Sequence, residues 1–577
     1  MAGTLLLPEA EHAIPPSTTD QIDSALDELE SRRKDWVALG VPERIALIDA
    51  CVAGVMAEAE AWAETDRQIK GIAPDSPLRG ESWISGPAPT VYNLQLFKHT
   101  LEQILETGRP QPPAFRTHTN GQTVVDVFPT TVWEKLVFQG FTHEVRLLPG
   151  VSIEDAQARM ARVYRGEKDD GGVSLVLGAG NVSSIAPTDA LHKLFVDDRV
   201  VILKMNPVNE RIGPHLEKAF APLIIDGYLR IVYGGGTEGA YLCQHALVSD
   251  VHITGSDKTH DAIVFGGGKE GAKRKKDNNP VLDKPMTSEL GNVTPIIVVP
   301  GPWTTGDTNF QGDNIASMLV QNAGFNCVAG RVIVTHRAWS GRTSLVNAVR
   351  DSLRRAEPRA PYYPGAVDRW QQYIDAHPEA ETFGPTGPEK VPFTLIADVD
   401  PDAADEMALT TEAFCGVFSE VGLEAPTSIP EYLAKAVSFV NEKVWGQLSA
   451  TIIVHPKSLK DPEVARAVEQ AIDELKYGNI AVNHWAAVPF GMMQATWGSH
   501  PGNTPDNIGS GIGIVHNSFM LNDVEKGVLR GPFKPPLKPY WFHTNRQLHR
   551  VGPRVFRYMA TENPRELPAL TAMSLIA

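Results

Sequence analysis

The sequence contains few cysteines, and none has the spacing of a metal site. Four occur in 577 residues: Cys51, Cys243, Cys327 and Cys415. They are widely separated and form neither a CxxC pair nor a Cys/His pattern typical of zinc. We therefore expect no disulfide framework and no metal site.

Long apolar runs and an excess of positive charge are also missing. No segment approaches the roughly 18 apolar residues that a membrane-spanning helix needs, and MAGTLLLPEAEHAIPPS lacks the basic start of a secretory signal. With 69 acidic and 53 basic side chains, the formal charge of −16 opposes binding to nucleic acid. We expect a cytoplasmic protein with no nucleic-acid or membrane partner. The one basic run, KEGAKRKKDNN at 269–279, is more typical of a solvated loop than of a phosphate site.

What the sequence does contain is a regular alternation of strand and helix patterns. Short β-branched runs such as GVSLVLGAGN, VVILKMNP, YLRIVYGGG and VHITGS are separated by helical segments, and a second such series follows TPIIVVPG. This alternation predicts βαβ units in two doubly wound, parallel α/β domains, the second starting near residue 292. Ligands of such sheets bind beyond the carboxyl ends of the strands.

Three segments lie outside these two series. Residues 18–66 show helical periodicity, with Thr18 or Thr19 as the expected cap of the first helix. The stretch RPQPP and the Asn-Gly pair of THTNGQTVVDVF predict a β excursion within residues 108–150. Beyond about residue 500, glycine, proline and asparagine dominate, and we expect this tail to wrap a surface.

One cysteine lies in an unusual setting. The stretch QNAGFNCVAG, residues 321–330, places Cys327 in a loop of small and polar residues between a helix and a strand. Such a loop exposes the sulfur and surrounds it with backbone donors, as a thiolate nucleophile requires. On these residues alone, a packed structural cysteine is the commoner interpretation, and both remain open.

A glycine motif suggests a nucleotide site. YGGGTEG fits G-x-G-x-x-G through Gly234, Gly236 and Gly239, with Asp257 at a plausible distance for a ribose contact. That fingerprint normally follows the first strand of its domain, whereas here it follows the third. A glycine-rich turn required for close packing is therefore an equally open interpretation.

Several segments in one order give a more specific signal. GAGN, VVILKMNP, VHITGS, TSELGNVTP, NAGFNCVAG and TEAFCGVF together resemble motifs of the NAD(P)-dependent aldehyde dehydrogenase superfamily, over residues 20 to 495. The resemblance implies an α/β fold with two doubly wound Rossmann-type domains and a β oligomerisation arm. It also implies an enzyme that acts on a small-molecule aldehyde.

The resemblance assigns three catalytic roles. Cys327 matches the nucleophile, and Glu289 in SELGN matches the general base of the family's LELGG segment. Asn181 is all that GAGNVSS retains of the family's PWNFP segment, and it matches the donor to the oxyanion.

A site for NAD or NADP is implied as well. Lys204 ends the second strand, TGS lies near the pyrophosphate, and TEAFCGV contacts the nicotinamide ribose and ring. The residues expected there, with one from the glycine motif, are Lys204, Gly234, Gly255, Ser256, Glu412 and Phe414. The acid that NAD-preferring relatives carry three residues after the lysine is replaced by Pro207, so we expect NADP to be accepted at least as well as by NAD-specific members.

The resemblance also divides the chain. Residues 1–115 and 151–291 are expected to form the NAD(P)-binding domain, 116–150 a β hairpin for oligomerisation, and 292–485 the catalytic domain. Residues 486–577 are expected to be a C-terminal extension that wraps a surface or joins subunits. A homo-oligomer, either a dimer or a tetramer, follows from the family's hairpin.

The predicted function is oxidation of an aldehyde to a carboxylic acid through a cysteine hemithioacetal and thioester. Two alternatives remain open. A CoA-acylating aldehyde dehydrogenase or acyl-CoA reductase would share Cys327 and the cofactor, and KMNP resembles such branches. A non-catalytic binding protein on the same fold would explain why several flanking motif residues have changed.

Overall fold

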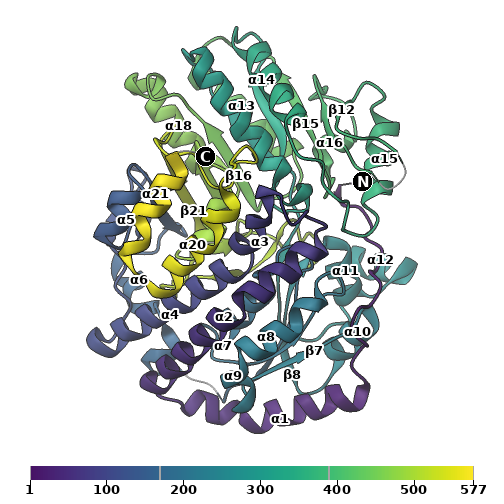
Figure 1. Cartoon of the computed structure of the whole chain (residues 1–577), viewed down its shortest axis with the longest axis vertical. Helices are drawn as coiled ribbons and strands as arrows, with labels where there is room; N and C mark the ends of the chain where they lie inside the picture. Colours follow the sequence, from purple (N-terminus) through teal and green to yellow (C-terminus); the bar gives the residue numbers. More distant parts are fainter. Residues whose placement is uncertain (1, 168–169, 388–389, 576–577) are drawn as a thin grey trace.

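A computed structural model describes residues 2–167, 170–387 and 390–575 of the chain. Two halves, each built around its own sheet, lie one above the other in Figure 1. The N-terminal helices and the smaller sheet form the lower half, and the larger sheet passes through the upper half. In the part of the chain that the structure describes, no helix has the length and apolarity needed to cross a bilayer.

The smaller sheet has six strands in the order β19-β9-β8-β5-β6-β7, all parallel except β19. Its β-branched strands are buried, as expected when helices cover both faces of a parallel sheet. The strands are β5 (Val173–Leu177), β6 (Val200–Lys204), β7 (Leu229–Val232), β8 (Val248–Gly255), β9 (Met286–Leu290) and β19 (Gly511–Ile512).

The larger sheet has eleven strands in the order β12-β13-β15-β11-β10-β16-β17-β21-β4-β3-β2. Its strands from β13 to β21 are parallel, and β12 and the β4-β3-β2 end are antiparallel. The strands are β2 (Ala114–Thr117), β3 (Thr123–Phe128), β4 (Thr142–Leu147), β10 (Thr294–Val298), β11 (Gly330–His336), β12 (Glu381–Phe383), β13 (Phe393–Ile396), β15 (Val417–Leu423), β16 (Ser449–Ile453), β17 (Asn479–Val482) and β21 (Val524–Arg530).

Helices surround both sheets (Figure 1). The first, α1, is capped by Thr18, whose hydroxyl accepts from the Gln21 backbone N–H while the Gln21 side chain accepts from Thr18 N–H. The longer helices are α1 (Thr19–Ala38), α2 (Val41–Ile69), α4 (Pro87–Thr107), α7 (Ile185–Phe195), α10 (Gly236–Gln244), α11 (Asp257–Phe265), α12 (Gly268–Lys276), α13 (Thr305–Val320), α14 (Arg342–Arg354), α15 (Ala366–Ala376), α17 (Ile429–Lys443), α18 (Pro462–Glu474), α20 (Leu548–Thr561) and α21 (Leu567–Leu575).

The segment expected to be an oligomerisation hairpin, 116–150, forms part of the larger sheet. Strands β3 and β4 pair with each other, a short helix, α5 (Val132–Val137), connects them, and β4 pairs with β21 of the same chain. The C-terminal segment thus supplies the strand that joins the hairpin to the catalytic half. It also supplies β19 to the smaller sheet, so it contributes to both halves rather than only wrapping a surface.

The N-terminal segment also connects the two halves, because it begins at the catalytic half and leads to the first helix. Strand β1 (Gly3–Thr4) pairs in parallel with β14 (Thr411–Glu412) of the catalytic half. At its other end, Ser17 N–H donates to the Tyr233 carbonyl, and Ser17 Oγ accepts from Tyr233 N–H, just after β7. Residues 3–17 therefore span the junction of the two halves.

Candidate active site

The loop that carries Cys327 is folded by three consecutive left-handed residues. Asn322, Ala323 and Gly324 have φ values of 53°, 55° and 80°. At Gly324 a Cβ atom would lie 2.5 Å from the Cys415 carbonyl oxygen, so only glycine fits there. The turn brings the chain from α13 back toward β11 and leaves Cys327 partly exposed at the junction of the halves.

The side chain of Asn322 holds this loop in place. Its Nδ2 lies 3.0 Å from the Asn181 carbonyl oxygen, 3.0 Å from the Phe325 carbonyl oxygen and 3.1 Å from Asn326 Oδ1. Asn322 is 1% exposed, so these bonds replace water that the amide cannot reach. The cysteine loop and the GAGN turn are therefore fixed to each other.

A buried arginine, which the sequence analysis did not identify, also holds the cysteine loop in place. The Arg331 guanidinium donates to the carbonyl oxygens of Gly324, Cys415 and Val417. It thereby joins the cysteine loop to the segment that contains Glu412. Burial lowers the pKa of Arg331, while the neighbouring Glu412 acts in the opposite direction. Arg331 is the second residue of β11, and its place in a β-branched run gave no signal of this role.

Cys327 and Glu289 are in direct contact. The sulfur lies 3.3 Å from Glu289 Oε1, and the thiol donates to the carboxylate. Glu289 lies on β9, 2% exposed, and burial raises its pKa to about 7. Burial and the nearby carboxylates of Glu289 and Glu412 raise the pKa of Cys327 well above its usual value. Near neutral pH the thiol therefore keeps its proton and faces a carboxylate that can accept it.

Asn181 lies beside this pair. Its Nδ2 donates to the Phe325 carbonyl at 2.9 Å, which accounts for one of its two amide hydrogens. Asn181 and Cys327 both line two separate cavities. The structure therefore brings together all three residues predicted to be catalytic.

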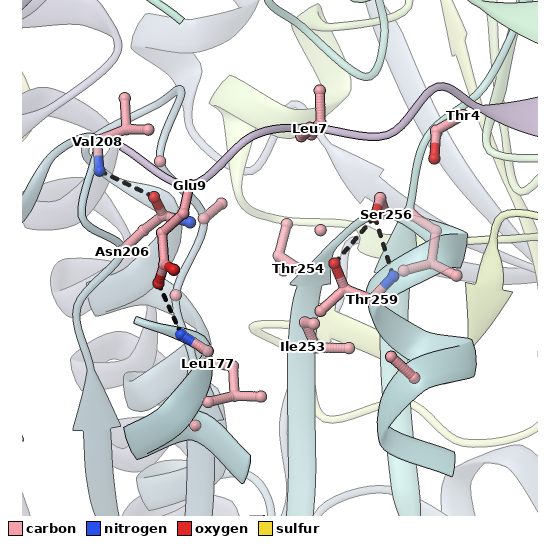
Figure 2. A pocket seen from close by; sticks show the side chains of 18 of the residues that line it. Thr4, Leu7, Glu9, Leu177, Asn206, Val208, Ile253, Thr254, Ser256 and Thr259 are labelled. Carbon is pink, nitrogen blue, oxygen red and sulfur yellow. Dashed lines mark hydrogen bonds between the residues drawn. The ribbon is translucent and has the colours of Figure 1, made fainter. Parts of the chain in front are cut away.

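The first cavity, of about 580 Å³, lies at the carboxyl ends of the smaller sheet's strands, the position expected for a ligand of a doubly wound sheet. Figure 2 shows part of its wall, with Ile253 and Thr254 near the end of β8 and Ser256 and Thr259 at the start of α11. Five of the six residues predicted to contact the cofactor line this cavity: Lys204, Gly255, Ser256, Glu412 and Phe414.

Gly234, the sixth, is not among the residues that line the cavity. Its carbonyl accepts from Lys204 Nζ at 2.6 Å, so Gly234 positions Lys204, which does line the cavity. The neighbouring Gly236 does line the cavity, and a Cβ atom there would meet no protein atom within 4 Å. The glycine turn therefore opens onto the cavity. Asp257, suggested for a ribose contact, instead accepts from Thr4 N–H at 3.0 Å.

The polar groups of this cavity fit a dinucleotide. Burial lowers the pKa of Lys204 to about 8, while the carboxylates of Glu238, Glu9 and Glu210 act in the opposite direction. Glu412 is buried, burial raises its pKa to about 8, and its Oε1 has no hydrogen-bond partner in the described structure. An unpaired buried acceptor suits a ligand hydroxyl such as that of a ribose.

The second cavity, of about 90 Å³, is also lined by Cys327, and its walls are mostly apolar with several aromatic side chains. Among the described residues that line it, none carries a formal charge. Its aromatic residues are Trp485, Phe490, Trp497, Tyr540 and Trp541. The last two belong to GPFKPPLKPYWFHTN, a proline-rich stretch whose sequence gave no indication that it reaches Cys327.

Groups suited to a metal ion are absent from the described residues: no three His, Cys, Asp or Glu side chains cluster in a way that could hold one.

The basic run in α12 lies away from the first cavity, since none of Lys273 to Lys276 lines it. Lys275 instead pairs with Asp261 at 2.7 Å.

Comparison with known proteins identifies the fold. No protein-family model and no curated protein matches the sequence. NAD-dependent aldehyde dehydrogenase from Sinorhizobium meliloti is similar in structure, with 18% identity and a TM-score of 0.59 over 90% of this chain and 89% of that one. Lactaldehyde dehydrogenase from Escherichia coli is similar over 89% of this chain and 92% of its own, with 16% identity and a TM-score of 0.59.

A third similar structure is NADP-dependent glyceraldehyde-3-phosphate dehydrogenase from Bacillus halodurans C-125 in complex with NADP. It has 16% identity and a TM-score of 0.57, over 89% of this chain and 92% of its own. The predicted fold class is thereby confirmed: this chain has the aldehyde dehydrogenase fold.

Proposed function

We propose that this protein is an NAD(P)-dependent aldehyde dehydrogenase that oxidises an aldehyde to a carboxylic acid. The observation that carries the proposal is the contact between Cys327 and Glu289 at the point where the two cavities meet. A nucleophile, its base and two separate binding spaces are what a reaction between an aldehyde and a second, larger ligand requires.

The reaction begins with proton transfer from Cys327 to Glu289. The resulting thiolate attacks the carbonyl carbon of an aldehyde in the second cavity, forming a C–S bond and a hemithioacetal oxyanion. Asn181 Nδ2 and the Cys327 backbone N–H are the proposed donors to this oxygen. Removal of one such donor typically slows a reaction about 100- to 1,000-fold.

A nicotinamide cofactor bound in the first cavity would accept the hydride that leaves the hemithioacetal carbon. The substrate is then an acyl thioester on Cys327. Glu289, after losing its proton to solvent, takes a proton from water, and the hydroxide adds to the thioester carbon. The C–S bond breaks, the acid leaves, and the thiolate is ready for another aldehyde.

Lys204, Glu412, Ser256 and Phe414 would hold the cofactor. Lys204 and Glu412 both line the cavity and offer a donor and an acceptor to ribose hydroxyls. Ser256 caps α11, whose first turn faces the cavity and favours an anionic group. Phe414 packs against Tyr363, with ring centroids 4.9 Å apart, and offers a flat apolar surface.

The second cavity favours an uncharged, apolar aldehyde. Contact with its apolar walls favours a bound apolar aldehyde, and the described residues that line it include no charged side chain to pair with a carboxylate or phosphate on the substrate. Transfer of the acyl group to coenzyme A requires no water-activating base, so the position of Glu289 supports hydrolysis instead.

Assembly and compartment remain predictions. We propose a homo-oligomer, in which the edge of β4 is not available to a second subunit because it already pairs with β21 of its own chain. The cytoplasmic location also remains a prediction.

The test is NAD(P)H formation from a panel of aldehydes, with and without coenzyme A. We expect turnover without coenzyme A, faster with hexanal or benzaldehyde than with succinic semialdehyde. A strict requirement for coenzyme A would contradict hydrolysis, and absence of turnover with every aldehyde and both cofactors would contradict the proposed function.

A further inference from the structure

The N-terminal segment crosses the mouth of the first cavity, where we propose that the cofactor binds. Figure 2 shows it passing over the strand ends, with Thr4, Leu7 and Glu9 on its course. Thr4, Leu5, Leu7, Pro8, Glu9 and Ala10 all line the cavity. We call residues 3–14 the strap.

The strap is held at three places along the cavity. Thr4 donates to Asp257 at the start of α11, and β1 pairs with the strand that carries Glu412. At the far end, Glu210 Oε2 lies 3.2 Å from His12 Nδ1, and its Oε1 accepts from the backbone N–H groups of Ala13 and Ile14. The strap therefore extends from the nicotinamide end of the cavity to the end where Lys204 lies.

Glu9 is placed at that second end. Its Oε1 accepts from the Gly236 backbone N–H at 2.8 Å, at the start of α10, and Figure 2 shows this bond. Its Oε2 has no hydrogen-bond donor among the described residues. Glu9 and Lys204 both line this cavity, and the Glu9 carboxylate acts to raise the pKa of the lysine. An acid and a lysine thus face the same cavity, where an adenosine ribose would bind.

The other charged groups at this end are already occupied. Glu210, the first acid after Lys204 in the sequence, is used by the strap, and Glu238 Oε2 accepts from Gly235 N–H at 2.8 Å. Pro207 lines the cavity and can accept nothing through its side chain. Lys204 is the only lysine among the described residues that line the cavity, and Arg369 is the only arginine.

We propose that Glu9 selects the cofactor, favouring a ribose with free hydroxyls over one that carries a 2′-phosphate. Its unpaired oxygen can accept from a ribose hydroxyl, whereas a phosphate in the same place meets a negative charge. This inference rests on the proposed function, because it concerns the cofactor of that site. It reverses the expectation drawn from Pro207, since the missing acid is supplied from the strap.

The test measures binding to the full-length chain without turnover. Dissociation constants for ADP-ribose and for 2′-phospho-ADP-ribose are measured by calorimetry. We expect the wild type to bind ADP-ribose at least about 30-fold more tightly, and Glu9→Gln to reduce this ratio about tenfold. Because Glu9 is exposed, the wild-type ratio should also fall as salt is added.

The matched control is Glu11→Gln, which removes the same charge from an exposed position of the strap that does not line the cavity. It should leave the ratio within about twofold of the wild-type value. Glu9→Lys should favour the 2′-phosphate ligand. Equal binding of the two ligands by the wild type, or equal changes in Glu9→Gln and Glu11→Gln, would overturn the inference alone. Failure of both ligands to bind at millimolar concentration would overturn the proposed function with it.

Discussion

The two cavities that meet at Cys327 are built in different ways. The first is lined largely by strand ends and helix starts of the smaller sheet, and its polar groups are positioned by backbone turns. The second is lined by apolar and aromatic side chains from segments far apart in the chain, including Ile84, Trp485 and Trp541.

This difference separates what the fold preserves from what it lets vary. A turn between strand and helix can present the same polar groups at low sequence identity, because the backbone supplies much of the binding. An aromatic wall depends on individual side chains and changes with each of them. The cofactor side should therefore resemble that of other proteins of this fold, while the aldehyde side should be particular to this chain.

The largest loss of turnover should follow removal of the Cys327 sulfur, which lies where the two cavities meet. Cys327→Ala should lower aldehyde turnover by about 10,000-fold or more, because no covalent intermediate can form. Binding of NAD(P)H, measured by fluorescence, should change little, since the cavity walls are intact. Cys51→Ala, a buried cysteine of α2 away from both cavities, is the control and should retain turnover. Undiminished oxidation by Cys327→Ala would refute the assignment.

Asn181 also lines both cavities, but its proposed role is to donate to a single oxygen. Asn181→Ala should lower kcat about 100- to 1,000-fold with a smaller change in KM, because the donor is used mainly after the thiolate has added. Steady-state kinetics with one aldehyde measure both constants. An increase in KM with unchanged kcat would show that Asn181 binds substrate rather than the oxyanion.

Glu289 should give the reaction its pH dependence. Burial raises the pKa of Glu289 to about 7, and only the carboxylate can accept a proton. Turnover should therefore decrease as the pH falls through about 7, approaching tenfold per pH unit on the acid side.

Glu289→Gln should lose this acid limb and slow steady-state turnover about 100-fold. Rapid mixing at high pH, where solvent can ionise Cys327, should still show a burst of NAD(P)H in this variant. Loss of the burst even at high pH, where solvent can take the thiol proton, would contradict a role limited to accepting protons.

The aldehyde side should show the smallest and most selective effect. Trp541→Ala should lower kcat/KM for hexanal about tenfold, because it removes apolar contact area, while kcat/KM for a short aldehyde such as acetaldehyde changes less. Trp133→Ala is the matched control, since Trp133 is 51% exposed on α5. Equal losses for long and short aldehydes would point to a general structural defect instead.

Much of the cofactor side could be anticipated from the sequence. Lys204, Gly255 and Ser256 stand at the ends of β-branched runs, where the periodicity of a parallel sheet already indicates ligand contacts. Cys327 and Glu289 are 38 residues apart and on different halves, so their 3.3 Å contact could be expected only from the resemblance.

The strap and the aromatic wall could not be anticipated. Glu9 and Trp541 reach the site through contacts between segments more than 200 residues apart, such as that between Thr4 and Asp257. Such contacts depend on tertiary packing and leave no periodic pattern in the chain. The same is true of Arg331, whose partners are backbone carbonyl groups that any residue could supply.

Because β21 lies between β17 and β4, β4 cannot complete its pairing until the C-terminal strand has been synthesised. Roughly 380 residues separate Leu147 from Val524, and a ribosome adding about 5–20 residues per second needs about 20 to 75 s to make them. Throughout that interval the edge of β4 lacks its partner, and unpaired edges promote aggregation. We expect ribosome-bound chains that end before Val524 to be cut by protease within the hairpin and full-length chains to resist. Early protection of the hairpin would show that it folds without waiting for the C-terminal strand.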